Sequence, residues 1–372
     1  MLPLKTVFMG TPEIASQSLL NILKLQKDGI VALKSVYTKP PSWNVRKKEF
    51  IVSPVEKIAR ENRINVRTPK TFKDSSEETD FLKSLVPDII IVVAFGLILP
   101  AEILNIPKYG ILNLHPSILP ELRGPSPIHY TILNMTKFGG VSIMAMDTGI
   151  DTGPVAAQQR IAIDKNENYS SLYSKLSLSG ALLLSEVIKT VYKFRINMFE
   201  SGFPQNKIEE SDSRVSGLTA LIKQEELYVD FSMDEPAVIY AKIRAFSEVG
   251  GAFFVFKNKN VKIMEAELLV DGECAEIKNE IKKEREGPKS PAFDYGDYAV
   301  RFPGDYKREI EKLQPEIVPG TIAAANKSGL VISTVRNGIY IRLIKLKPEG
   351  RNIMNYNDFI NGFRIKQGDI CR

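Results

Sequence analysis

Asn113 and His115 are the residues whose types and spacing point most directly to chemistry. They stand two positions apart at the start of NLHPSILPELRGPSP, residues 113–127, directly after an apolar run. Asp151 follows in the polar turn MDTGIDTG, residues 146–153, at the end of the next expected strand, so the three residues would lie on adjacent strand ends. An aspartate can orient an imidazole for proton transfer, and an asparagine amide can donate a hydrogen bond to a developing oxyanion. The three side chains could therefore catalyse an acyl transfer that uses no serine or cysteine nucleophile.

These residues also have simpler interpretations. Asn113 and His115 could serve only to hydrogen-bond the backbone of a turn that four prolines stiffen. Asp147 competes with Asp151 for the position beside the histidine, and either aspartate could cap a turn because each precedes a Thr-Gly pair. The location of Asn113 and His115 favours chemistry, since ligands of open parallel sheets bind at the carboxyl ends of the strands.

Apolar runs that alternate with helical patterns fill the first half of the chain. This alternation predicts an α/β fold with a Rossmann-like, mainly parallel sheet covered on both faces. The first strand-to-helix turn, FMGTPEIA, holds one glycine where a dinucleotide fold carries G-x-G-x-x-G. We therefore expect no NAD or FAD on that turn. The strands are expected near residues 5–10, 30–38, 64–69, 88–96, 110–115 and 140–147.

The chain of 372 residues exceeds what one hydrophobic core usually holds, so two domains are expected. Residues 1–200 form the predicted catalytic domain, and the polar, aperiodic residues 201–217 form the predicted linker. Short strands at regular spacing over residues 218–372 predict a small OB-like β-barrel. A charge-rich insert at about residues 271–316 interrupts it, and we expect a helix followed by a mobile excursion there.

Composition excludes several classes of protein. The chain is 44% hydrophobic and 25% charged, as soluble globular proteins are. Its longest apolar run, residues 89–99, is far shorter than the roughly 20 residues that span a bilayer, and its N-terminus lacks the pattern of a signal peptide. With Cys274 and Cys371 as its two cysteines, it has neither a disulfide framework nor a cysteine-ligated metal cluster. We therefore expect a cytoplasmic protein, and its net charge of +6 suits a polyanionic partner.

Long, ordered stretches of the sequence carry a resemblance to a known family. AFGLILP at 94–100, GILNLHPSILPELRGPSPI at 110–128 and GVSIMAMDTGIDTGPV at 140–155 resemble the formyltetrahydrofolate-dependent formyltransferases. Within that superfamily the chain is most similar to the methionyl-tRNA formyltransferase family. The likeness extends over nearly the whole chain, as far as PGTIAAANKSGLVIST at 319–334.

The resemblance implies an activity and a set of site residues. The enzyme would transfer the formyl group of its co-substrate, 10-formyltetrahydrofolate, to the α-amine of charged initiator tRNA, without a metal and as a monomer. The family's catalytic residues fall on Asn113, His115 and Asp151. Its folate-contacting segment falls on Ser117, Ile118, Leu119 and Pro120.

A basic loop after the second expected strand would hold the tRNA. The stretch KPPSWNVRKKEF, residues 39–50, resembles the loop with which the family enters the tRNA acceptor end. Trp43 in this loop offers a face on which a base could stack. From composition alone, the loop could equally be a solvated charged turn. The residues expected to bind the tRNA are Arg46, Lys47 and Lys48.

Two other functions stay open on these residues. The catalytic set would also serve a formyl-folate enzyme whose acceptor is a small amine, such as glycinamide ribonucleotide or an amino sugar. The basic loop and the matching C-terminal region favour tRNA over that acceptor. A non-catalytic RNA-binding protein is the third hypothesis, which the intact set of Asn, His and Asp disfavours. Arg123 likewise has two interpretations, as a brace of its own loop or as a ligand contact.

Overall fold

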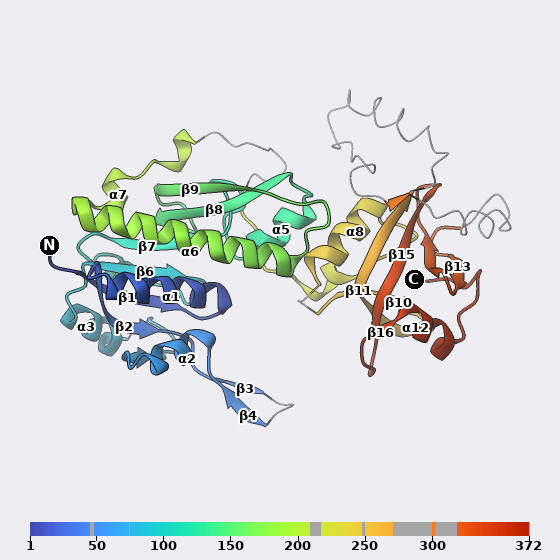
Figure 1. Cartoon of the computed structure of the whole chain (residues 1–372), viewed down its shortest axis with the longest axis horizontal. Coiled ribbons are helices and arrows are strands. Elements are labelled where there is room, and N and C mark those ends of the chain that lie inside the picture. Colours follow the sequence, from blue (N-terminus) through green and yellow to red (C-terminus); the bar gives the residue numbers. More distant parts are fainter. Residues whose placement is uncertain are drawn as a thin grey trace. The chain divides into compact units, whose positions relative to one another are not determined.

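The computed structural model describes residues 1–44, 48–73, 75–208, 217–247, 250–270, 300–301 and 318–371. The chain forms two compact units, which can be followed by their sequence colours in Figure 1. The first unit comprises Met1–Thr131, Thr136–Ile163 and Ser171–Ala220, and the second comprises Ile132–Met135, Asp164–Ser170 and Leu221–Arg372. Apart from residues 300 and 301, the expected insert at about 271–316 lies outside the described residues.

Seven strands form one sheet in the first unit, in the order β5-β2-β1-β6-β7-β8-β9. The first five strands in this order are parallel, and β8 and β9 continue the sheet antiparallel. The predicted α/β fold with a mainly parallel sheet is confirmed. The strands are β1 (Leu4–Gly10), β2 (Val31–Tyr37), β5 (Val66–Arg67), β6 (Ile89–Val93), β7 (Ile111–His115), β8 (Phe138–Ala145) and β9 (Val155–Ala162).

Both faces of this sheet are covered. Ile89, Ile91 and Val93 of β6 enter a core shared with α1 and α6, whereas Ile90 and Val92 enter a second core shared with α3 and α4. A strand buried on both faces has to be apolar at every position, which explains the run IIIVV. The helices are α1 (Glu13–Lys27), α2 (Pro54–Glu61), α3 (Ser76–Ser84), α4 (Ala101–Leu104), α5 (Pro127–Leu133), α6 (Tyr169–Phe194) and α7 (Met198–Ser201), followed by the 3-10 helix η1 (Gln205–Lys207).

The register of the parallel strands brings their carboxyl ends level. Gly10 of β1 pairs with Val93 of β6, and Val93 pairs with Leu114 of β7. Directly after β6, Ala94 adopts a left-handed conformation (φ 44°) that turns the chain. The end of β7 therefore lies at the carboxyl edge of the sheet, where α/β folds bind their ligands.

The second unit is built on an antiparallel sheet in the order β10-β11-β15-β14-β13. No pairing joins β10 to β13 within the described strands, so this part of the chain shows an open sheet and the closed, OB-like barrel is not confirmed. None of the described helices is both long enough and apolar enough to cross a membrane. The strands are β10 (Ala252–Phe256), β11 (Lys259–Val270), β12 (Val300–Arg301), β13 (Ile322–Asn326), β14 (Gly329–Ser333), β15 (Ile339–Pro348) and β16 (Met354–Asn355), and the helices are η3 (Gln224–Leu227), α8 (Pro236–Ala245) and α12 (Tyr356–Phe363).

Candidate active site

The structure brings Asn113, His115 and Asp151 together. Asn113 and His115 share one face of β7, because alternate residues of a strand point the same way. Asn113 Nδ2 lies 3.4 Å from Asp151 Oδ1, and His115 Nδ1 lies 3.5 Å from Asp151 Oδ2. These distances are long for hydrogen bonds, as catalytic contacts often are before a substrate binds. One carboxylate thus lies within reach of both an amide and an imidazole.

Asp151 reaches this position by a route that the sequence did not indicate. Parallel strands would place the ends of β7 and β8 at one edge, but β8 runs antiparallel, and its last residue, Ala145, pairs with Leu112. The loop between β8 and β9 therefore has to fold back toward His115. Asp151 does so with a left-handed backbone (φ 51°), which is uncommon for residues other than glycine.

Asp147, the alternative to Asp151, hydrogen-bonds its own loop. Its Oδ1 accepts from the Gly149 backbone at 3.0 Å and from Thr152 Oγ1 at 2.7 Å. The base of the loop is closed by a hydrogen bond from Ala145 N to Pro154 O of 2.9 Å. One aspartate therefore shapes the loop, and the other faces the imidazole.

His115 is buried, and both of its ring nitrogens face acceptors. Nε2 lies 2.9 Å from the Leu122 carbonyl oxygen, which can only accept, so we assign a hydrogen to this nitrogen. Nδ1 faces Asp151, whose Oδ2 also accepts from the Gly124 backbone at 2.9 Å. The loop that follows β7 therefore holds the ring through Leu122 and the carboxylate through Gly124.

Two side chains fix the backbone of the predicted folate segment. Ser142 Oγ donates to Ser117 O at 2.7 Å and accepts from Leu119 N at 3.1 Å. Gln158 Nε2 donates to Leu119 O at 2.7 Å, and Ser117 Oγ donates to Glu121 O at 2.6 Å. The Ser117 hydroxyl and carbonyl and the Leu119 backbone groups are therefore hydrogen-bonded within the protein.

The four residues of that segment differ in accessibility. Ser117 and Leu119 are buried, whereas Ile118 and Pro120 are half-buried. A ligand beside the segment would therefore meet the apolar side chains of Ile118 and Pro120, while Ser117 and Leu119 anchor the backbone beneath them.

The expected tRNA loop, residues 39–50, contains β3 (Ser42–Asn44) and most of β4 (Glu49–Ile51), which pair as a separate antiparallel hairpin. Arg46 and Lys47 lie outside the described residues, and Lys48 is exposed. Trp43 and Phe50 pair across the hairpin with ring centroids 5.1 Å apart, and they are 54% and 69% exposed. An exposed aromatic pair beside a basic tip is well suited to contact nucleic acid.

Sequence reasoning missed three polar side chains that hold the site, namely Ser142, Gln158 and Gln205. A serine inside the apolar run GVSIMAM was the available signal for Ser142. The two glutamines belong to no motif, and Gln205 falls in the stretch assigned to the linker. Arg123 braces the site through Gln205, since its Nε and Nη2 lie 2.8 and 2.6 Å from Gln205 Oε1.

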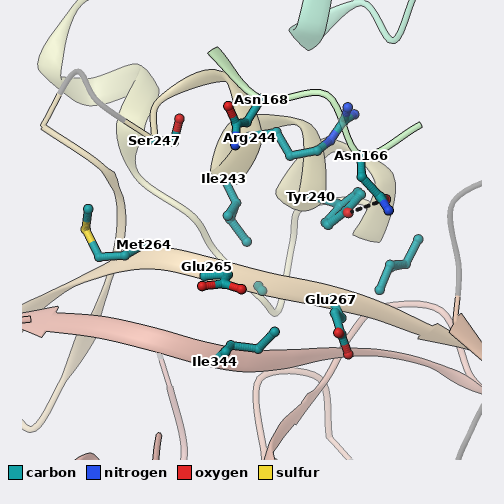
Figure 2. A pocket seen from close by; sticks show the side chains of 12 residues that line it. Asn166, Asn168, Tyr240, Ile243, Arg244, Ser247, Met264, Glu265, Glu267 and Ile344 are labelled. Atoms are coloured by element: carbon teal, nitrogen blue, oxygen red, sulfur yellow. Dashed lines mark hydrogen bonds between the residues drawn. The ribbon is translucent and has the colours of Figure 1, made fainter. Parts of the chain in front are cut away.

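A cavity of about 300 Å³ lies in the second unit. Figure 2 shows it between α8, β11 and the segment that carries Asn166. The two carboxylates that line it are paired, Glu265 with Lys345 at 2.6 Å and Glu267 with Arg342 at 2.9 Å. It contains none of the expected catalytic residues. Across the described ranges, no three His, Cys, Asp or Glu side chains are grouped so that they could hold a metal ion.

Comparison with known proteins decides the family. Residues 4–188 match the formyl transferase family and residues 221–364 match the formyl transferase C-terminal domain. The methionyl-tRNA formyltransferase of Caldicellulosiruptor saccharolyticus is 33% identical over 366 residues, which cover 98% of each chain. That of Wolbachia pipientis is 39% identical over 264 residues, 71% of this chain and 81% of the relative. The chain belongs to the methionyl-tRNA formyltransferase family.

A solved structure shares the fold of this methionyl-tRNA formyltransferase family member. The N-formyltransferase from Helicobacter canadensis, in complex with folinic acid and dTDP-3-aminofucose, has a TM-score of 0.55 and 20% identity, covering 91% of this chain and 98% of its own. The family match over residues 4–188 includes Asn113, His115 and Asp151. The side chains that the structure gathers at the sheet edge thus lie in the formyl transferase region of the family.

The separate contacts of the two aspartates predict different effects of the same substitution. Asp151→Asn removes the carboxylate that faces His115, so we expect formyl transfer to slow by about 10² or more. Asp147→Asn keeps a side-chain oxygen that can cap the turn, so we expect a loss of less than about tenfold. Single-turnover formyl transfer by the two purified variants measures both rates. A larger loss in Asp147→Asn would contradict the assignment of the two aspartates.

Proposed function

We propose that this formyltransferase moves the formyl group of 10-formyltetrahydrofolate to the α-amine of methionyl initiator tRNA. The observation that supports the proposal most strongly is the convergence of Asn113, His115 and Asp151 at the carboxyl edge of the sheet. It occurs in a chain that matches a methionyl-tRNA formyltransferase over 98% of its length. The proposed compartment is the cytoplasm, because the acceptor is a tRNA used to start translation.

The proposed reaction needs alignment and proton transfer more than it needs a strong nucleophile. The amine nitrogen forms a bond to the formyl carbon, the bond from that carbon to N10 of the folate breaks, and the proton that the amine loses ends on N10. A free α-amine is already a fair nucleophile, so the protein has to orient it and to hold the carbonyl. No metal is required for these steps, and we propose none.

Each member of the set has a task in this scheme. Asn113 donates its amide hydrogen to the formyl oxygen as that oxygen gains negative charge. His115 takes the proton from the attacking amine at Nδ1, because Nε2 already carries the hydrogen that faces Leu122, and Asp151 beside Nδ1 positions the ring and stabilises the charge that results. Because the Leu122 carbonyl holds Nε2, the ring is already fixed before the substrates arrive.

The co-substrate is proposed to lie along residues 117–120. Two partly exposed apolar side chains, Ile118 and Pro120, suit the flat ring system of a folate, and a backbone held by Ser142 and Gln158 keeps them in place. Ser117 and Leu119 contribute to this site through the backbone geometry that they maintain.

The tRNA is proposed to be held by two parts of the chain. Arg46, Lys47 and Lys48 at the hairpin tip neutralise phosphates, and Trp43 stacks on a base. Residues 218–372 form the proposed tRNA-binding domain, whose open sheet would belong to an OB-like barrel, and residues 201–217 link it to the catalytic domain of residues 1–200. We propose that one copy of the chain suffices for the reaction.

A direct assay distinguishes this function from its alternative, transfer to a small amine. The purified protein is incubated with 10-formyltetrahydrofolate and either methionyl-tRNA, glycinamide ribonucleotide or an amino sugar nucleotide. We expect formylation of methionyl-tRNA, reduced by at least about 10² in Asn113→Ala and in His115→Ala. Transfer to a small amine and never to charged tRNA would overturn the proposal. A protein that binds tRNA without transferring formyl would be the non-catalytic RNA-binding protein instead.

The hairpin predicts a specific salt dependence. If Arg46 and Lys48 each neutralise one phosphate, replacing either with alanine should lower the slope of log affinity against log salt by about one. Lys108 is an exposed lysine that precedes β7, at the opposite edge of the sheet from the site, so Lys108→Ala is the matched control. Filter binding of methionyl-tRNA over a salt series gives the slopes. Equal slopes in Lys48→Ala, Arg46→Ala and the control would rule out the phosphate contacts.

A further inference from the structure

The side chain of Gln205 makes four hydrogen bonds at the candidate site. It lies in η1 and is 4% exposed. Its Nε2 donates to the backbone oxygens of Asp151 and Gly153, both at 2.8 Å. Its Oε1 accepts from Arg123 Nε at 2.8 Å and from Arg123 Nη2 at 2.6 Å. Both amide hydrogens and both oxygen lone pairs are therefore in use.

The chemistry of its partners fixes the orientation of this amide. A guanidinium can only donate, and a backbone carbonyl can only accept, so the oxygen of Gln205 has to face Arg123 and the nitrogen has to face the loop. Glutamate in this position could still accept from Arg123. Its second carboxylate oxygen, however, would face the backbone oxygens of Asp151 and Gly153, and neither side could donate a hydrogen. Glutamine is thus the side chain that satisfies both sides of the contact.

The loop that Gln205 hydrogen-bonds has a conformation that contacts from outside the loop have to stabilise. Asp151 has a left-handed backbone, which costs a non-glycine residue free energy and persists where the surroundings impose it. The backbone of Gly153 packs so closely on β8 that no side chain fits there, since a Cβ on it would lie 1.8 Å from the Ala145 carbonyl oxygen. Gln205 bonds the backbone of both residues, and so fixes the stretch that aims the Asp151 carboxylate.

Arg123 connects this contact to the loop after β7. Thr219 holds the Arg123 carbonyl oxygen through its backbone nitrogen at 2.7 Å and its hydroxyl at 2.9 Å. The next residue, Gly124, donates its backbone hydrogen to Asp151 Oδ2 at 2.9 Å. The two loops are therefore joined twice, once at the backbone of Asp151 through Gln205 and once at its carboxylate through Gly124.

We propose that Gln205 is a positioning residue for formyl transfer, which it supports by bridging Arg123 to the backbone of Asp151 and Gly153 and so directing the Asp151 carboxylate toward His115. This inference rests on the proposed function of the same site. It assigns part of the stretch expected to be a linker to the scaffold of the active site. Gln205 touches no reacting atom and acts through Asp151.

The test combines Gln205→Glu with Asp151→Asn. Displacing a catalytic group by about 1 Å can cost about 10² in rate, so we expect Gln205→Glu to lower kcat by about 10- to 100-fold and to leave KM for tRNA and folate within about threefold. In the Asp151→Asn background, Gln205→Glu should lower kcat by less than a further factor of about three, because its effect passes through the Asp151 carboxylate. Gln158→Glu, a half-buried glutamine that also holds a loop, is the matched control, and its rate loss should multiply with that of Asp151→Asn.

A second readout separates failure of this inference from failure of the proposed function, because it needs no activity. The chain has two histidines, so the ¹⁵N-histidine NMR spectrum can be assigned with one His129→Gln variant. We expect Gln205→Glu to move the His115 ring signals in the direction that Asp151→Asn moves them. If Gln205→Glu does not fold, Arg123→Met releases Gln205 Oε1 from the other side and should give the same pattern. Unmoved His115 signals, or losses that multiply fully with Asp151→Asn, would overturn the positioning role.

Discussion

The Asp151 carboxylate is the point on which the candidate site depends. It has to lie near the Asn113 amide and the His115 ring at once, and it does so from a loop whose backbone is left-handed at that residue. Such a conformation is maintained only where several contacts impose it. Gly124, Gln205 and the cap at Asp147 supply those contacts. The sheet supplies the other requirement, because β7 presents Asn113 and His115 on one face at the level where β1 and β6 end.

The sequence was informative where local patterns carry the signal. The apolar run of β6 and its neighbours predicted a mainly parallel sheet, and the long motif around His115 led to the family that the comparisons show. The arrangement around Asp151 was expected for a partly wrong reason. Consecutive strand ends were assumed to share an edge, but β8 is antiparallel and the loop folds back. Strand direction depends on pairing partners, which no local pattern reports.

The supporting polar residues could not be predicted because their partners are distant along the chain. Gln205 bonds Asp151 from 54 positions away and Arg123 from 82, and Gln158 bonds Leu119 from 39. A glutamine in a polar stretch carries no mark of such a role. In the second unit the short strands were recognised, but closure of a barrel depends on which edges meet. The described strands form an open sheet, so the OB-like barrel is a proposal.

A double-mutant cycle between His115 and Asp151 measures whether the carboxylate works through the imidazole. Single-turnover formyl transfer to methionyl-tRNA is measured for His115→Ala, Asp151→Asn and the double variant, with folding checked by circular dichroism. If the carboxylate works through the imidazole, the double variant should be within about threefold of the slower single variant, because residues that act as one unit are strongly non-additive. A double loss equal to the product of the single losses would mean that the two side chains act independently, and would contradict a role of Asp151 through His115.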